Sequence, residues 1–131
     1  MSDLVYLLDS EGLSRAVLGD RTTGARLKAA DRSGIRVVTT SMTLIEAYHD
    51  RVKKVAWAWT LSRIAVEPVT REIAGEAIEL LEMAGLHGHK YAIDAALAAV
   101  ALRQPGDVTI FTSDPQDMRL LCADRVASCG L

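Results

Sequence analysis

The sequence predicts a three-layer α/β/α sandwich with a central, mainly parallel sheet. Short apolar segments at residues 4–8, 35–40 and 108–112 predict buried strands, and segments of helical character separate them. Parallel strands need crossover connections, which are usually helical, so this alternation favours a parallel sheet between helices. With 131 residues, the chain has the length of one domain, and we expect a single domain over 1–131.

The predicted helices carry apolar residues at helical spacing or have capping residues at their ends. The most regular one starts after Thr70 and ends before Gly85. Residues 86–89 then predict a loop, and residues 90–103 a helix that is apolar almost all round and therefore buried. Residues 64–69 are only a weak strand candidate, because a proline interrupts them. Further helices are predicted from residue 10, over 23–32, 41–48 and 52–63, and after Asp114.

The composition favours a folded cytoplasmic protein. Hydrophobic residues make up 50% of the chain and charged residues 24%, which is typical of a globule and not of a disordered chain. No apolar run approaches the ~18 residues of a membrane span, and no signal-peptide pattern is present. Cys122 and Cys129 lack the spacing of a zinc or redox site, so we expect reduced thiols. The net charge of −2 disfavours binding of a polyanion, although Arg51, Lys53 and Lys54 form a local basic cluster.

Four acidic residues occupy positions from which they can meet. Asp9 and Asp114 follow apolar strands, Glu46 lies about one turn into the helix after another strand, and Asp94 interrupts the apolar helix. Ligands of parallel α/β sheets bind outside the carboxyl ends of the strands. Carboxylates that converge there repel one another and raise their pKa values unless a cation is bound. Oxygen-only ligands favour Mg²⁺ or Mn²⁺, which activate water for phosphodiester hydrolysis.

Each of these acids also has a purely structural interpretation. Asp9 could cap the first helix, and Glu46 could complete a capping box. Asp114 and Asp117 fit a cap and a third-position acid at the start of the last helix. Asp94 could form a salt bridge or a hydrogen bond with a neighbouring loop. The metal-site hypothesis therefore depends on the set and not on any single acid.

The same acids lie in four short motifs: YLLDS at 6–10, LIEA at 44–47, DAALAA at 94–99, and TSD at 112–114 with Asp117 beyond it. In this order and at these intervals, the motifs resemble PIN-domain nucleases, particularly the VapC-type toxins of bacterial VapBC toxin–antitoxin pairs. The resemblance spans nearly the whole chain. It implies a PIN-like sandwich, a Mg²⁺ or Mn²⁺ site, and endonucleolytic cleavage of single-stranded or looped RNA.

The resemblance also implies roles for individual residues and for partners. The metal-binding and catalytic residues would be Asp9, Glu46, Asp94 and Asp114, with Asp117 as an auxiliary acid and Thr112 orienting the site through its hydroxyl. The expected partners are the RNA substrate, a second copy in a homodimer, and an antitoxin whose peptide enters the acidic groove with a basic side chain. No membrane partner is expected.

Other functional classes fit the sequence less well. A response-regulator receiver needs a lysine after a late strand, and no lysine follows Lys90. A phosphatase with an aspartate nucleophile needs a DxD motif, whereas Asp9 is followed by Ser10 and Glu11. The alternative that stays open is a non-catalytic PIN-fold module that binds RNA or a partner, although such a module has little use for converging carboxylates.

Two groups of residues receive no assigned role. Trp57 and Trp59 lie in an apolar stretch that suits either an interface or ordinary core packing. His49, His87 and His89 have no nucleophile paired with them, and the latter two are expected at the surface.

Overall fold

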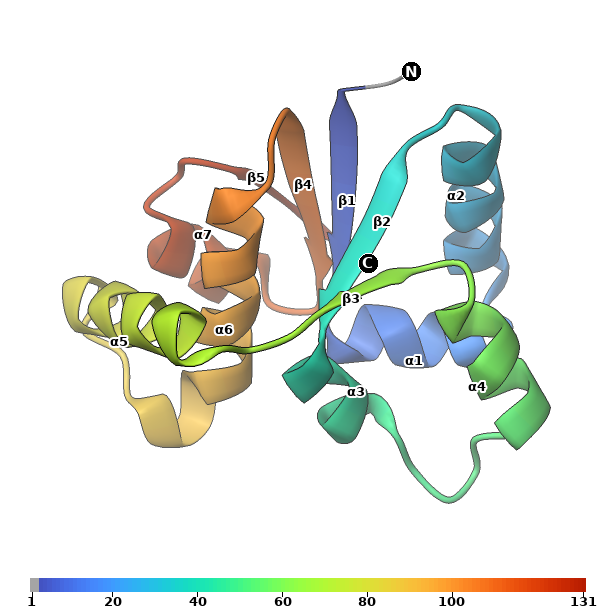
Figure 1. Ribbon diagram of the computed structural model, residues 1–131, viewed down its shortest axis with the longest axis horizontal. Helices are drawn as coiled ribbons and strands as arrows, with labels where there is room; N and C mark the ends of the chain where they lie inside the picture. The colour runs from blue at the N-terminus through green and yellow to red at the C-terminus, as the bar shows by residue number, and fades with distance from the viewer. Residues whose placement is uncertain (1–2) are drawn as a thin grey trace.

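The computed structural model describes residues 3–131, which form a parallel sheet between two layers of helices (Figure 1). The strand order is β3-β2-β1-β4-β5, and every neighbouring pair is parallel. This is the α/β/α sandwich that the sequence predicts. The strands are β1 (Leu4–Leu8), β2 (Arg36–Thr40), β3 (Ala65–Glu67), β4 (Asp107–Thr112) and β5 (Ala127–Gly130).

Helices cover both faces of the sheet. One face packs against α1, α2 and α4 and the other against α5, α6 and α7, while α3 lies at the end of β2 and contacts both α1 and α6 (Figure 1). Within residues 3–131, no helix combines the length and apolarity that crossing a membrane requires. The helices are α1 (Ser10–Leu18), α2 (Arg21–Arg32), α3 (Ser41–Ala47), α4 (Lys54–Leu61), α5 (Arg71–Ala84), α6 (Gly88–Arg103) and α7 (Pro115–Cys122).

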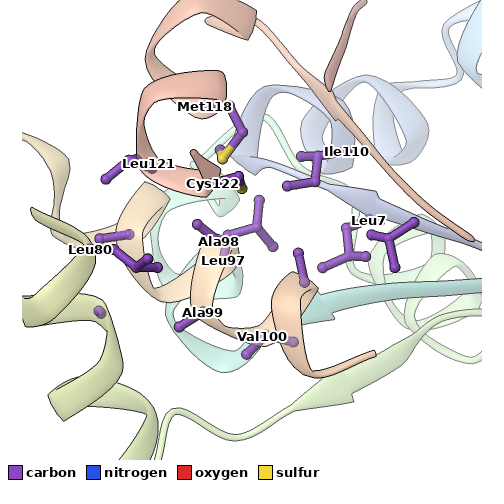
Figure 2. Close-up of a cluster of buried hydrophobic side chains, with 14 of the residues drawn as sticks. Leu7, Leu80, Leu97, Ala98, Ala99, Val100, Ile110, Met118, Leu121 and Cys122 are labelled. Carbon is purple, nitrogen blue, oxygen red and sulfur yellow. The ribbon is translucent and has the colours of Figure 1, made fainter. Parts of the chain in front are cut away.

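The larger core lies between the sheet and the layer formed by α5, α6 and α7 (Figure 2). Leu7 and Ile110 from the sheet meet the stretch Ala95–Ala101 of α6, all seven residues of which are buried. This burial explains why the α6 sequence is apolar almost all round. Cys122 of α7 belongs to the same core, where burial raises the pKa of its thiol to about 11. Both Cys122 and Cys129 are free, as predicted.

Capping residues set the ends of α5 as the sequence predicts. The Thr70 side chain accepts a hydrogen bond from the backbone N–H of Ile73, and Gly85 closes the helix in the left-handed conformation. Gly106, in the turn before β4, also has a backbone conformation that favours glycine. A Cβ atom at this residue would lie 2.1 Å from the carbonyl oxygen of Asp3, and its φ of +87° also requires glycine.

The structure departs from the predicted elements in three places. It adds β5, whose sequence Ala-Ser-Cys-Gly contains no residue of high strand propensity and which is a strand because it pairs with β4. Helix α6 begins at Gly88, so it includes two residues of the predicted loop. Helix α4 covers Lys54–Leu61 and is shorter than the predicted segment 52–63.

Leu97 offers a test of the packing between α6 and the sheet. Its side chain is 1% exposed, so Leu97→Ala should lower the free energy of unfolding by about 2–5 kcal/mol through the cavity that it creates. Met83→Ala is the matched control, because Met83 is 78% exposed on α5 and should change stability by no more than ~0.5 kcal/mol. Urea unfolding followed by circular dichroism measures both. A small effect of Leu97→Ala would contradict the described core.

Candidate active site

Three of the predicted site acids follow three adjacent strands. Strand β1 lies between β2 and β4, and the carboxyl ends of parallel strands share one edge of the sheet. Asp9 directly follows β1, and Asp114 lies two residues after β4. Glu46 belongs to α3, which begins directly after β2. Figure 1 shows α1 and α3 beginning at this edge.

Asp9 is buried, with 4% of its surface exposed, and its carboxylate accepts three hydrogen bonds. Oδ1 accepts from the backbone N–H of Gly12 at 2.8 Å, which makes Asp9 the N-cap of α1. Oδ2 accepts from the backbone N–H of Ser113 at 2.9 Å and from its hydroxyl at 3.3 Å. The predicted capping role is therefore confirmed. A carboxylate offers about four lone-pair sites, so one site remains for a further ligand.

Asp94 is half-buried on α6 and has no structural partner of the kind considered above. Within residues 3–131 it forms no ion pair and accepts no hydrogen bond, so the salt-bridge interpretation is not supported. Burial raises its pKa from the ordinary value of 3.8 to about 6. The negative charges of four other acids add to this rise, namely Asp9, Glu46, Asp114 and Asp117 in decreasing order of effect.

Glu46 and Asp114 do not have the capping roles that the sequence allows. The N-cap of α3 is Thr40, so Glu46 lies too far along the helix to complete a capping box and is exposed. Asp114 occupies the N-cap position of α7 before Pro115, as predicted, but its side chain makes no capping hydrogen bond. Asp117 lies half-buried in the first turn of α7. Thus Glu46 and Asp114 present carboxylates that helix capping does not use.

Whether the acids can hold a metal ion depends on their spacing and on their chemistry. The other four acids influence the pKa of Asp94, yet within residues 3–131 no group of three or more His, Cys, Asp or Glu side chains is arranged so that it could hold a metal ion. We take the electrostatic coupling as evidence of a shared neighbourhood, and not of a closed ligand cage. A set of carboxylates fits Mg²⁺ or Mn²⁺, because Mg²⁺ uses one or two carboxylates and retains several waters. The assignment of Asp9, Glu46, Asp94 and Asp114 as metal ligands stays a prediction.

Comparison with known proteins identifies a related fold. No protein-family model matches the sequence, and no curated protein matches it. The structure is similar to a chain in the crystal structure of VapBC2 from Rickettsia felis bound to a DNA fragment from their promoter, with 16% sequence identity and a TM-score of 0.70. The match covers 97% of this chain and 98% of that chain. This chain shares the fold of that VapBC2 chain. The resemblance inferred from the sequence motifs is thereby confirmed at the level of the fold.

In this VapBC2-like fold, buried hydroxyl groups hold the backbone around the acids. Thr112 is fully buried, and its hydroxyl accepts a hydrogen bond from the backbone N–H of Asp114 at 3.0 Å. The Thr39 hydroxyl donates to the carbonyl oxygen of Leu8 at 2.8 Å and so connects β2 to the end of β1. The sequence predicts no individual role for Thr39 or for Ser113, although Ser113 lies within the TSD motif. Their signal is a polar residue directly at or after the end of a buried strand.

A surface groove of this VapBC2-like fold, about 530 Å³ in volume, lies away from the acids between α1, α2, β2 and α4. None of the five acids lines it. Trp59 lies on this groove with 59% of its surface exposed, whereas Trp57 packs against the smaller core. The two tryptophans therefore differ: one serves core packing and the other is available to a ligand. His87 and His89 are exposed, as predicted.

Asp94→Asn should stabilise the protein in metal-free buffer at neutral pH. The folded state binds the Asp94 proton more tightly than the unfolded chain, so stability falls as pH rises from about 4 to about 6. Removing this ionisation should add about 1–2 kcal/mol to the free energy of unfolding at pH ~7.5 after allowance for solvent screening, and little at pH ~4.

Urea unfolding in EDTA at the two pH values measures this difference. Asp50→Asn is the matched control, because Asp50 is exposed outside the acidic edge and should show no such pH dependence. Equal stability of Asp94→Asn and the unmodified protein at neutral pH would contradict the electrostatic coupling of the acids.

Proposed function

We propose that the protein is a Mg²⁺- or Mn²⁺-dependent endoribonuclease, which hydrolyses RNA phosphodiester bonds in the cytoplasm as the toxin of a toxin–antitoxin pair. The observation that carries this proposal is Asp94, an unpaired half-buried carboxylate whose pKa is raised by burial and by the charges of four other acids. The position of the acids at the carboxyl edge of the sheet supports a ligand site. The motif resemblance and the shared fold support a nuclease of the PIN kind.

Each residue of the site contributes in a way that its surroundings define. When bound, a divalent ion supplies an activated water and neutralises phosphate oxygens. Asp9 would offer its remaining lone pair from a carboxylate that three hydrogen bonds hold in place. Glu46, Asp94 and Asp114 would hold the ion or its waters, with Asp117 as an auxiliary acid. Thr112 fixes the backbone that carries Asp114.

RNA cleavage by the purified protein tests the proposal. A panel of RNAs should be cut with Mn²⁺ or Mg²⁺ and not with EDTA, and Asp94→Asn and Glu46→Gln should each lower the rate by roughly a hundredfold or more. Glu11→Gln is the control, because Glu11 is an exposed acid on α1 that pairs with Arg15. Asp9→Asn is less informative, since an amide nitrogen in the place of Oδ2 cannot accept the hydrogen bonds from Ser113.

The alternative of a non-catalytic RNA- or partner-binding module makes a different prediction. Such a module would bind RNA without cutting it under any metal condition. Cleavage that persists unchanged in both Asp94→Asn and Glu46→Gln would refute the proposed roles instead, because another group would then perform the reaction.

We also propose a cognate antitoxin and a homodimer as partners, following the resemblance and the VapBC2 neighbour. The groove between α1, α2 and α4 offers the antitoxin a largely apolar surface, with Leu27, Val37 and Trp59 in its lining. Its charged lining residues are of both signs, namely Asp20, Arg21, Lys28, Asp31 and Arg63. A mainly apolar segment of the antitoxin would complement this groove, while the resemblance implies that another part of its peptide presents a basic side chain to the acids.

Gly24 supports the proposal that a partner protein approaches the backbone of α2 in this groove. It lies inside α2 and lines the groove, and no heavy atom lies within 4 Å of a Cβ added there. Glycine inside a helix costs about 0.5–1 kcal/mol relative to alanine. Because the packing of this chain does not require that glycine, the space above it is open to a partner.

Two substitutions at Gly24 should therefore affect different properties, one the stability of the isolated protein and the other the binding of a partner. Gly24→Ala should stabilise the isolated protein by about 0.5–1 kcal/mol in urea unfolding. Gly24→Leu should weaken binding of the product of a co-expressed neighbouring reading frame, measured by co-purification and calorimetry. Gly75→Leu is the control, because Gly75 lies in α5 with equally open surroundings and away from the groove. Unimpaired partner binding by Gly24→Leu would exclude the groove as the docking surface.

A further inference from the structure

We propose that single-stranded RNA reaches the acidic site along the segment between α3 and α4. One unpaired base would stack on the ring of Tyr48, and neighbouring phosphates would contact Arg51, Lys53 and Lys54. These four residues are called the α3–α4 patch below. The inference rests on the proposed function, because its ligand is the RNA that the acidic site would cut.

The cations of the α3–α4 patch differ from most others in the protein by being uncommitted. Within residues 3–131, no ion pair or side-chain hydrogen bond uses the side chains of Arg51, Lys53 or Lys54, and all three are exposed. Asp50 is the only acid among residues 48–54, so this stretch carries a formal charge of +2. By contrast, ion pairs engage Arg15, Arg36, Arg63 and Arg103.

An acidic site that binds RNA needs nearby cations to attract the phosphates, and the α3–α4 patch provides them. The whole chain has a net charge of −2, and Asp94 lies in the field of four other acids, so phosphates would otherwise be repelled. Affinity for a polyanion comes mainly from cations that displace its counterions. A cluster of uncommitted cations in the segment that follows Glu46 would supply that attraction without neutralising the carboxylates.

Tyr48 adds a surface for a base. Its side chain is 46% exposed, and its ring is fixed perpendicular to that of Trp57, with 5.1 Å between the centroids. Trp57 itself is half-buried against the smaller core. Nucleic-acid bases of any sequence stack on exposed aromatic rings. Trp59 is a less suitable stacking surface for a base, because the guanidinium of Arg63 lies over its ring at 4.8 Å. Trp59 also lines the groove between α1, α2 and α4 and not the α3–α4 patch.

The α3–α4 patch follows Glu46 of the acidic site closely in the sequence. Tyr48 is two residues after Glu46, and Arg51 is five residues after it, which limits their separation to about 18 Å. The loop is held in place, since Val52 is buried and both its backbone N–H and that of Arg51 donate to His49. Figure 1 shows α3 and this loop on the side of the molecule where β1 and β2 end.

Binding measurements in EDTA test the inference without depending on cleavage. The probe is a fluorescein-labelled single-stranded RNA, titrated by anisotropy over a range of salt concentrations. Tyr48→Ala should weaken binding by roughly five- to hundredfold, whereas Tyr48→Phe should bind within about twofold of the unmodified protein. Replacing Arg51, Lys53 and Lys54 together by Gln should reduce the slope of log affinity against log salt by about 2, or ~0.7 per cation.

The matched control removes the same charge from α2 by replacing Arg21, Lys28 and Arg32 with Gln, and it should leave that slope unchanged. A control that lowers the slope equally, a Tyr48→Ala variant that binds normally, or equal affinity for duplex RNA would overturn the inference. So would a failure of the unmodified protein to bind single-stranded RNA at all. Absence of metal-dependent cleavage alongside the expected binding results would count against the proposed nuclease and not against the α3–α4 patch.

Discussion

The carboxylate of Asp9 joins three parts of the molecule that must stay together for the acidic edge to exist. It directly follows β1, caps α1 through Gly12, and binds the loop after β4 through Ser113. A buried carboxylate without partners would be strongly destabilising, and here three donors offset that cost. The structural and the functional interpretations of Asp9 are therefore compatible, since the same hydrogen bonds that stabilise the fold also fix the direction of a prospective ligand.

The other acids at this edge lack such compensation. Asp94 has no ion pair or hydrogen bond within residues 3–131, and it lies in the field of four further negative charges. Protein interiors seldom retain an unpaired acid without a use for it, and strongly shifted groups of this kind cluster at functional sites. The molecule thus gives up some stability at neutral pH at the point where its proposed chemistry would occur, while the apolar stretch Ala95–Ala101 on the same helix anchors α6 in the core.

The sequence was sufficient to predict those parts of the structure that depend on local pattern. Apolar runs predicted β1, β2 and β4, and capping residues located the ends of α5. Strand β5 could not be predicted, because its strand conformation depends on pairing with β4. The order of the acids pointed to one edge of the sheet, but only side-chain partners could separate the true cap at Asp9 from the unused carboxylates of Glu46 and Asp114. The role of Ser113 could not be predicted, because a serine beside a strand has many ordinary uses.

The placement of β4 next to β1 also has a consequence in time. The hydrogen bond from Ser113 to Asp9 joins residues that are 104 positions apart. The central strand β1 cannot pair on both sides until β4 has been synthesised. Contacts of such long range form late in folding, and a nascent chain emerges from its amino end. A growing polypeptide therefore carries β1 with one side unpaired until β4 has been synthesised. The acidic edge is therefore complete only after the segment that carries Asp114 and Asp117 has been synthesised.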